Sequence, residues 1–87
     1  MPKNNFMNRT NLYVPIQVDK IFLKGFGEKL KKLRKEKGFS QAQLAFESNI
    51  EISQISRIER GLINTTIANA KHLSKILEVD LKEMFDF

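Results

Sequence analysis

Apolar residues recur at helical spacing through most of this chain. In FGEKLKKLRKEK, residues 26–37, Phe26, Leu30 and Leu33 fall at positions i, i+4 and i+7, and lysines fill the other face. This spacing predicts an amphipathic helix whose apolar side packs on a core. Gly38 follows the last periodic position and is suited to a left-handed C-terminal cap, so we expect the helix to end there.

The start of this first helix has two alternatives. Asp19 could cap a longer helix that continues through Phe22, because the spacing from Phe22 to Phe26 is helical. Gly25 and Gly27 lie within that continuation and weaken it, since glycine costs about 1 kcal/mol relative to alanine in a helix interior. The sequence leaves both starts open.

Two shorter helices are expected within SQAQLAFESNIEISQISRIERG, residues 40–61. Ser40 and Gln43 form a capping-box pattern, in which the serine oxygen accepts from an early backbone N–H and the glutamine reaches back. Asn49 tolerates the left-handed backbone that a sharp corner needs. A second short helix then covers about 52–60 and ends at the next glycine, so the two helices are joined by a tight corner.

The remaining apolar positions predict two further helices. Thr66 can cap a fourth helix, whose apolar stripe consists of Ile67, Ala70, Leu73 and Leu77. Asp80 and Glu83 form another capping-box pattern, which would open a short last helix. That helix would contain Leu81, Met84 and Phe85. The whole pattern predicts an all-α fold, a compact arrangement of five helices.

The first 23 residues show no helical periodicity. Residues 1–11 are rich in asparagine and carry no periodic apolar face, which is typical of a mobile arm. From Leu12 to Val18 apolar and polar residues alternate as in a strand, but Pro15 permits only an edge strand. Such a strand would pair with a second copy or pack as an extended segment on the helices. We therefore expect an N-terminal extended arm at 1–23, partly disordered or strand-like, and a helical domain at 24–87.

Composition restricts the classes of protein that fit this pattern. The chain has 87 residues, 41% hydrophobic and 29% charged, which suits one small domain. Cysteine is absent, so packing or oligomerisation rather than disulfides or thiolate metal sites must hold the domain together. No apolar run approaches the roughly 18 residues that cross a bilayer, and no signal peptide is recognisable. We expect a soluble, cytoplasmic protein that does not enter membranes.

Charge is concentrated in the middle of the chain. The formal net charge is +5, and residues 24–61 carry nine basic and five acidic side chains, against three and four in residues 62–87. A basic segment that coincides with the two short helices favours a polyanion as partner. From charge alone, a solvated lysine-rich helix face explains the segment equally well.

The helix at about 52–60 has two chemically distinct faces. At about 100° per residue, Ile55 and Ile58 point to one side. The opposite side carries Ser53, Ser56, Arg57 and Arg60. Short serines let a helix sink into a DNA groove, and arginine offers a planar fork that suits guanine O6 and N7, or phosphate. Both partners stay open for Arg57, and the serines could also be solvated surface.

Four segments, taken together in this order, resemble the lambda-repressor-like helix-turn-helix domain of the xenobiotic-response-element (XRE) class. They are LRKEKG at 33–38, SQAQLA at 40–45, ISRIERG at 55–61 and AKHLSKILEVDL at 70–81. The resemblance extends over residues 26–87. It implies a five-helix domain that binds double-stranded DNA and regulates transcription, as phage repressor and Cro proteins do.

The resemblance also implies roles for individual side chains. The base-facing positions of the class are occupied by Ile52, Ser53 and Arg57, and the groove-facing Ser56 joins them as a base-contact candidate. The phosphate-contact positions are occupied by Gln41, Arg60 and Asn64. Arg34 and Glu59 match an internal ion pair, for which we expect a structural role.

Three residues depart from the usual pattern of this class. Glu51 stands where serine or threonine commonly caps the recognition helix, and phosphate repels its carboxylate unless that group accepts from a cytosine amino group. Ile52 stands where a polar base reader is frequent, and it could instead contact a thymine methyl. Thr65 replaces the proline that commonly precedes the fourth helix, which would loosen the turn and leave the fold intact.

The sequence shows no catalytic or metal-binding constellation. His72 has no cysteine, second histidine or convergent carboxylate pair beside it, so we expect a surface or packed histidine rather than a metal ligand. Gly25 and Gly27 open no strand-to-helix phosphate loop. We therefore expect neither enzyme activity nor a cofactor.

Two functions remain open at this stage. The first is a transcriptional regulator, expected to be a repressor, that binds a palindromic operator as a homodimer. The apolar residues left for such a dimer are Leu81, Met84, Phe85 and Phe87, together with the segment 12–18. Phe46 lies off the apolar face of its helix and could dock the arm or a partner. The second function is an antitoxin-like module that mainly holds a partner protein, with DNA binding secondary.

Overall fold

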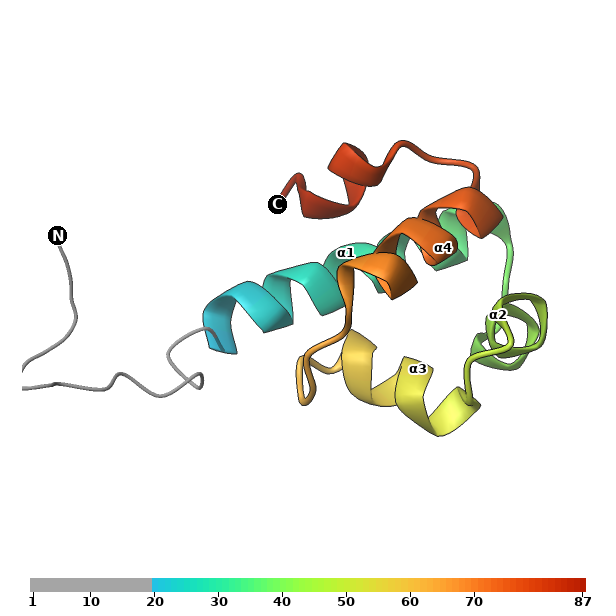
Figure 1. Cartoon of the computed structure of the whole chain (residues 1–87), viewed down its shortest axis with the longest axis horizontal. Helices are drawn as coiled ribbons and strands as arrows, with labels where there is room; N and C mark the ends of the chain where they lie inside the picture. Colours follow the sequence, from blue (N-terminus) through green and yellow to red (C-terminus); the bar gives the residue numbers. More distant parts are fainter. Residues whose placement is uncertain (1–19) are drawn as a thin grey trace, which may run out of the picture.

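The structure, a computed structural model, describes residues 20–87 (Figure 1). Within this range four α-helices and one 3-10 helix follow one another, and no strand occurs. They are α1 (Lys20–Lys37), α2 (Gln41–Ser48), α3 (Ile52–Glu59), α4 (Ile67–Leu77) and the 3-10 helix η2 (Leu81–Phe85). The all-α class is confirmed. The count of five holds only for helical segments, because the fifth is a 3-10 helix.

The first helix, α1, is the longer of the two alternatives. It begins at Lys20, so the expected boundary after residue 23 lies inside a helix. Residues 1–19, with the strand-like segment, fall outside the described range. Gly27 is tolerated within α1 because α3 ends directly against it: a Cβ atom there would lie 2.6 Å from the carbonyl oxygen of Glu59. The glycine thus lets α1 and α3 pack at backbone distance.

Local caps set the corner between α1, α2 and α3 as the sequence predicts. Gly38 ends α1 with a φ of +87°. Ser40 Oγ accepts from the backbone N–H of Gln43 at 3.0 Å, and Gln43 Oε1 accepts from the backbone N–H of Ser40 at 2.7 Å, which completes the capping box. Asn49 ends α2 in the left-handed conformation, with a φ of 58°. The turn between α2 and α3 is therefore held by local chemistry.

The caps near the C-terminus agree with the sequence only in part. Thr66 caps α4 as predicted, because its hydroxyl oxygen accepts from the backbone N–H of Asn69 at 2.9 Å. The predicted capping box at Asp80 and Glu83 is wrong. The backbone N–H of Glu83 donates to the carbonyl oxygen of Asp80 at 3.0 Å, as a 3-10 turn requires, and the aspartate side chain makes no capping bond.

One core joins all five segments. α3 and η2 lie on opposite sides of the pair formed by α1 and α4, as Figure 1 shows. The buried apolar side chains are Phe26, Leu30, Leu33, Leu44, Ile50, Ile55, Ile58, Ala70, Leu73, Leu77 and Met84. Met84 is fully buried, so the expectation that it lines a dimer surface is wrong. The apolar side of α3 is anchored in this core, so the polar side of α3 lies at the edge of the domain.

Candidate nucleic-acid interface

The exposed side of α3 carries most of the predicted base-contact residues. Ile55 and Ile58 point into the core, with 0% and 1% of their surface exposed. On the other side Ser53, Ile52 and Arg57 are exposed, and Ser56 is half-buried. In Figure 1 no other described element lies below α3. The described residues therefore leave this helix face open to a groove of DNA.

A buried network fixes α3 relative to α1 and α2. Arg34 Nε lies 2.6 Å from Glu59 Oε2, and Arg34 Nη2 donates to Glu59 Oε1 at 3.1 Å. The third guanidinium nitrogen, Nη1, donates to the carbonyl oxygen of Phe39 at 2.8 Å. Both charged side chains are more than nine-tenths buried. Such a bidentate pair has a defined geometry, so the end of α3 is tied to α1 and to the turn before α2.

Gln41, the first residue of α2, joins the same network. Its Nε2 donates to Glu59 Oε1 at 2.9 Å. An amide nitrogen carries two hydrogens, so one N–H remains for a phosphate oxygen. The phosphate contact expected for Gln41 stays a prediction, and the hydrogen bond to Glu59 leaves one amide hydrogen free for it.

The turn after α3 presents the other two phosphate-contact candidates. Arg60 and Asn64 are both exposed, and Gly61 between them has a φ of +73°. Asn64 Oδ1 accepts from the backbone N–H of Thr65 at 2.9 Å, and Thr65 Oγ1 accepts from Asn69 Nδ2 at 3.3 Å. Proline could make neither bond. The turn is therefore held by hydrogen bonds at the position where Thr65 departs from the usual pattern.

Glu51 precedes α3 without capping it. Its backbone is extended, its side chain makes no capping hydrogen bond, and it is exposed. The carboxylate consequently lies beside the open face of α3 with its oxygens available as acceptors. A DNA base could meet it only through a donor such as the amino group of cytosine.

Comparison with known proteins identifies the class of this domain. A family model described as helix-turn-helix matches residues 30–84. The chain belongs to this helix-turn-helix family. A relative is the control protein C.BamHI of Bacillus amyloliquefaciens, 41% identical over 63 residues, which are 71% of this chain and 78% of that protein. The transcriptional regulator SlrR of Bacillus subtilis (strain 168) is 44% identical over 61 residues, which cover 69% of this chain but 40% of SlrR.

Solved structures support the same assignment. The restriction-modification controller protein C.AhdI from Aeromonas hydrophila superposes with a TM-score of 0.74 at 36% identity, over 77% of this chain and 97% of that chain. The helix-turn-helix family consists of DNA-binding regulators of transcription, in agreement with the open face of α3. Within residues 20–87 no helix is both long and apolar enough to span a bilayer.

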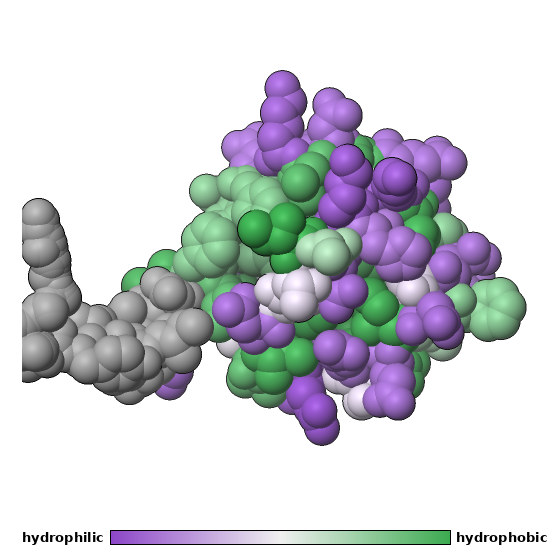
Figure 2. Space-filling view, viewed as in Figure 1, coloured by the Kyte–Doolittle hydropathy of each residue, from purple (hydrophilic) through white to green (hydrophobic). Residues whose placement is uncertain are grey.

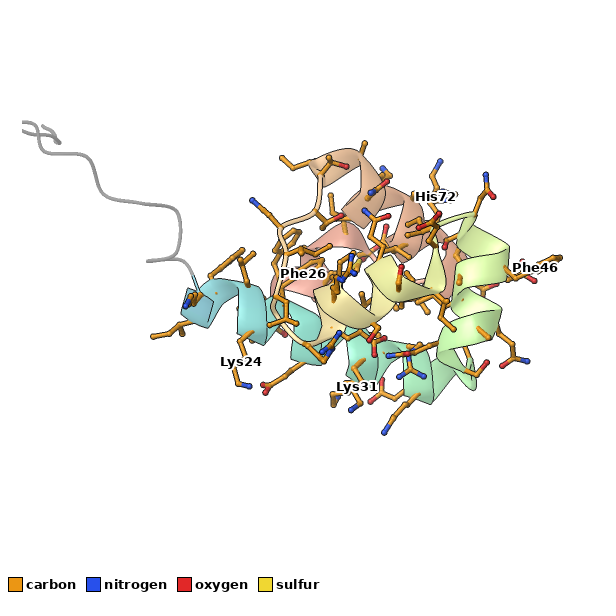
Figure 3. The ribbon with its side chains drawn as sticks, turned by 90° about the horizontal axis from the view of Figure 1, so that it is seen from below. Lys24, Phe26, Lys31, Phe46 and His72 are labelled. Atoms are coloured by element: carbon orange, nitrogen blue, oxygen red, sulfur yellow. The ribbon has the colours of Figure 1, made fainter. Side chains whose placement is uncertain are left out.

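His72 and Phe46 lie at the α2 end of the helix-turn-helix domain (Figure 3). His72 Nε2 lies 2.8 Å from the carbonyl oxygen of Ser48, so the ring links α4 to the end of α2. No group of three potential metal ligands occurs among residues 20–87. Phe46 is 84% exposed and projects away from the domain, and it is not part of the described core.

The sequence did not indicate an aromatic cluster where α1 begins. The ring of Phe22 lies 6.2 Å from that of Phe85 and 5.3 Å from that of Phe87, and the rings of Phe26 and Phe85 are 5.2 Å apart. Phe22, Phe85 and Phe87 keep 49%, 39% and 55% of their surface exposed. Apolar side chains accordingly gather beside the start of α1 in Figure 2. A signal was available in the helical spacing of Phe22 and Phe26.

Proposed function

We propose that this protein regulates transcription by sequence-specific binding to double-stranded DNA, with α3 in the major groove, and that it acts as a repressor. The observation that carries the proposal is the open serine and arginine face of α3, held outward by two buried isoleucines. We also propose that the protein is cytoplasmic, because a regulator of transcription must share a compartment with DNA. Its relatives are named as control proteins and transcriptional regulators.

Base recognition in this proposal depends on four side chains of α3. Arg57 donates both arms of its guanidinium to a guanine, which is the commonest specific contact in the major groove. Ser53 and Ser56 donate to or accept from neighbouring base edges, and Ile52, 49% exposed, covers a thymine methyl. Because the isoleucine is apolar, this protein should prefer a thymine where related domains prefer a base that bonds a polar side chain.

Phosphate contacts in this proposal flank the bases that α3 reads. Gln41 at the start of α2 and Arg60 with Asn64 after α3 would bind the backbone on the two sides of the groove. These contacts fix the position of the helix and carry no sequence information by themselves. We assign the Arg34–Glu59 pair a structural role, because it is buried and joins α1 to the end of α3.

We propose further that the protein binds as a homodimer on a palindromic operator. Two recognition helices about 34 Å apart would then read successive turns of one DNA face. The aromatic cluster of Phe22, Phe85 and Phe87 supports this, because it is exposed and continues into an apolar cleft of about 280 Å3. Within the described residues the cluster contacts the core through Phe26, whose ring lies 5.2 Å from that of Phe85, and its outer side stays exposed.

Selection of bound duplexes from a random pool, followed by titration at two salt concentrations, tests the function. We expect one sequence, with a two-fold symmetric pattern, to win over scrambled DNA by at least about 10³-fold at moderate salt. Binding of selected and scrambled duplexes with equal affinity would overturn the proposal. That result would leave a protein-holding, antitoxin-like role, for which the exposed Phe46 is the available observation.

A further inference from the structure

One side of α1 carries a row of lysines. At about 100° per residue, Lys20, Lys24 and Lys31 fall within roughly 40° of one another. All three are exposed, and Lys24 and Lys31 project from the same edge of α1 in Figure 3, which views the domain from the α3 side. The family model matches only from residue 30, so Lys20 and Lys24 precede the part of the chain that it describes.

Two glycines bring this edge of α1 against the end of α3. A Cβ atom on Gly27 would lie 2.6 Å from the carbonyl oxygen of Glu59, the last residue of α3. From the other side, a Cβ atom on Gly61 would lie 2.7 Å from Cα of Lys24. Gly61 directly follows Arg60, so Lys24 lies against the turn that holds a phosphate-contact candidate. The backbone contact fixes this proximity, which does not depend on flexible side chains.

Lys20, Lys24, Arg60 and Asn64 line a common cleft of about 510 Å3, which we call the flanking cradle. The other lining residues are Leu23, Gly61 and Leu62, so the cradle contains three cationic groups and no acidic one. The nearest carboxylate recorded for Lys24 is that of Glu28, 3.8 Å from its Nζ, with both side chains about 70% exposed. An exposed pair of this kind is worth little and is readily replaced by a phosphate.

We propose that the flanking cradle binds phosphates of the DNA backbone just outside the base pairs that α3 reads. Arg60 and Asn64 contact the phosphate next to the groove, and Lys20 and Lys24 extend the contact to neighbouring phosphates beyond the half-site. This inference rests on the proposed function and deepens it. Its consequence is that DNA flanking the operator strengthens binding without contributing sequence preference.

The test compares two duplexes that contain the selected operator. One is trimmed to the base pairs contacted by the recognition helices, and the other extends about ten base pairs beyond each end. The variant is Lys20→Ala with Lys24→Ala, and the matched control is Lys32→Ala, on the same helix but about 120° away from Lys20. Lys32 is paired with Glu36 at 2.9 Å, whose hydrogen bond and charge raise the pKa of the lysine.

We expect the double variant to lose about tenfold in affinity on the extended duplex and less than about twofold on the trimmed one. The slope of log K against log salt should flatten by about 1.8 per protomer on the extended duplex, since two phosphate contacts are lost. The control should stay within about twofold of the native protein on both. Equal losses on the two duplexes, or no loss on the extended one, would overturn the inference.

Two further measurements separate this inference from its premises. Both lysines are exposed and alanine favours helix, so the thermal midpoint should not change. If it does, Lys24→Gln, which removes the charge but keeps a polar side chain, must show the same dependence on duplex length. Arg57→Ala reports the function itself: it should reduce sequence preference on both duplexes alike. A native protein that selects its operator but is indifferent to flanking DNA refutes the flanking cradle alone, whereas one without sequence preference refutes both proposals.

Discussion

Arg57 and Arg60 lie three residues apart, and their surroundings support the different contacts that we propose for them. Arg57 is exposed within α3 itself, on the side opposite the buried isoleucines. Arg60 is the C-cap of α3, and its Nε lies 3.4 Å from the carbonyl oxygen of Ser56, which holds the side chain near the helix end. We therefore propose the first arginine as a base reader and the second as a phosphate contact.

Replacing Arg57 with alanine should cost about 1–3 kcal/mol on the operator and relax preference at one base position, because a bidentate contact is lost. Replacing Arg60 with alanine should instead weaken all sequences alike and flatten the salt slope by about one unit. Titration of operator duplexes that each carry one altered base pair distinguishes the two variants. Unchanged discrimination by the Arg57 variant would contradict its assignment as a base reader.

The buried Arg34–Glu59 pair predicts a loss of stability rather than of specificity. Glu59→Ala should lower the free energy of unfolding by about 3–5 kcal/mol, because the guanidinium is left buried without its partner. Lys32→Ala, which breaks the exposed pair with Glu36, should change the free energy of unfolding little, because solvent screens that pair. Urea denaturation measures both. Similar losses in the two variants would show that burial does not distinguish these ion pairs.

At the scale of single elements, the sequence predicts a helix end correctly where neighbouring residues determine it. The capping box at Ser40 and the left-handed Asn49 are encoded by neighbouring residues, so α2 and its corner were predicted correctly. The start of α1 could not be decided in this way, because Gly27 is justified only by carbonyl groups of α3 that are distant in sequence. The last segment forms a 3-10 helix although Asp80 and Glu83 have capping-box spacing, since the backbone N–H of Glu83 is already bonded.

Gly25 and Gly27 provide a matched pair within α1. Helix propensity alone would give about 1 kcal/mol of stabilisation to an alanine at either position. At Gly27 the new methyl group would meet backbone carbonyl groups of α3, so we expect Gly27→Ala to destabilise the domain by about 1–3 kcal/mol. At Gly25 the three nearest atoms all belong to the ring of Phe87, a side chain that is 55% exposed and can rotate away.

We therefore expect Gly25→Ala to be neutral or slightly stabilising. Thermal or urea unfolding of the two variants gives the comparison directly. If both substitutions stabilise the protein, α1 is not held against α3 as closely as the structure has it.

At the scale of the whole molecule, residues that are distant in sequence combine into surfaces that no single segment contains. Phe22 at the start of α1 meets Phe85 and Phe87 at the C-terminus, and Lys24 meets the turn after α3. The sequence identified the face of α3 because helical periodicity is local information. It named Phe85 and Phe87 for a dimer surface, but it could not place Phe22 beside them or Lys24 beside the turn after α3, because these contacts join segments that are distant in sequence. The aromatic cluster and the flanking cradle therefore both include residues at the start of α1, and we propose a second protomer for the first and DNA for the other.

The aromatic cluster predicts a dimer that a single charge can disrupt. Phe87→Asp places a carboxylate among the rings of an exposed apolar surface, so it should raise the dimer dissociation constant by at least about tenfold. Phe46→Asp is the control, because Phe46 is 84% exposed on α2 and makes no ring contact among the described aromatic pairs. Sedimentation measures the mass of each variant over a range of concentrations.

DNA binding gives a second measurement of the same contact. Binding to a full palindrome should weaken for the Phe87 variant far more than binding to a single half-site, since only a full palindrome is bound more tightly by a preformed dimer. If Phe46→Asp rather than Phe87→Asp separates the protomers, the contact between copies lies on α2 and not at the start of α1.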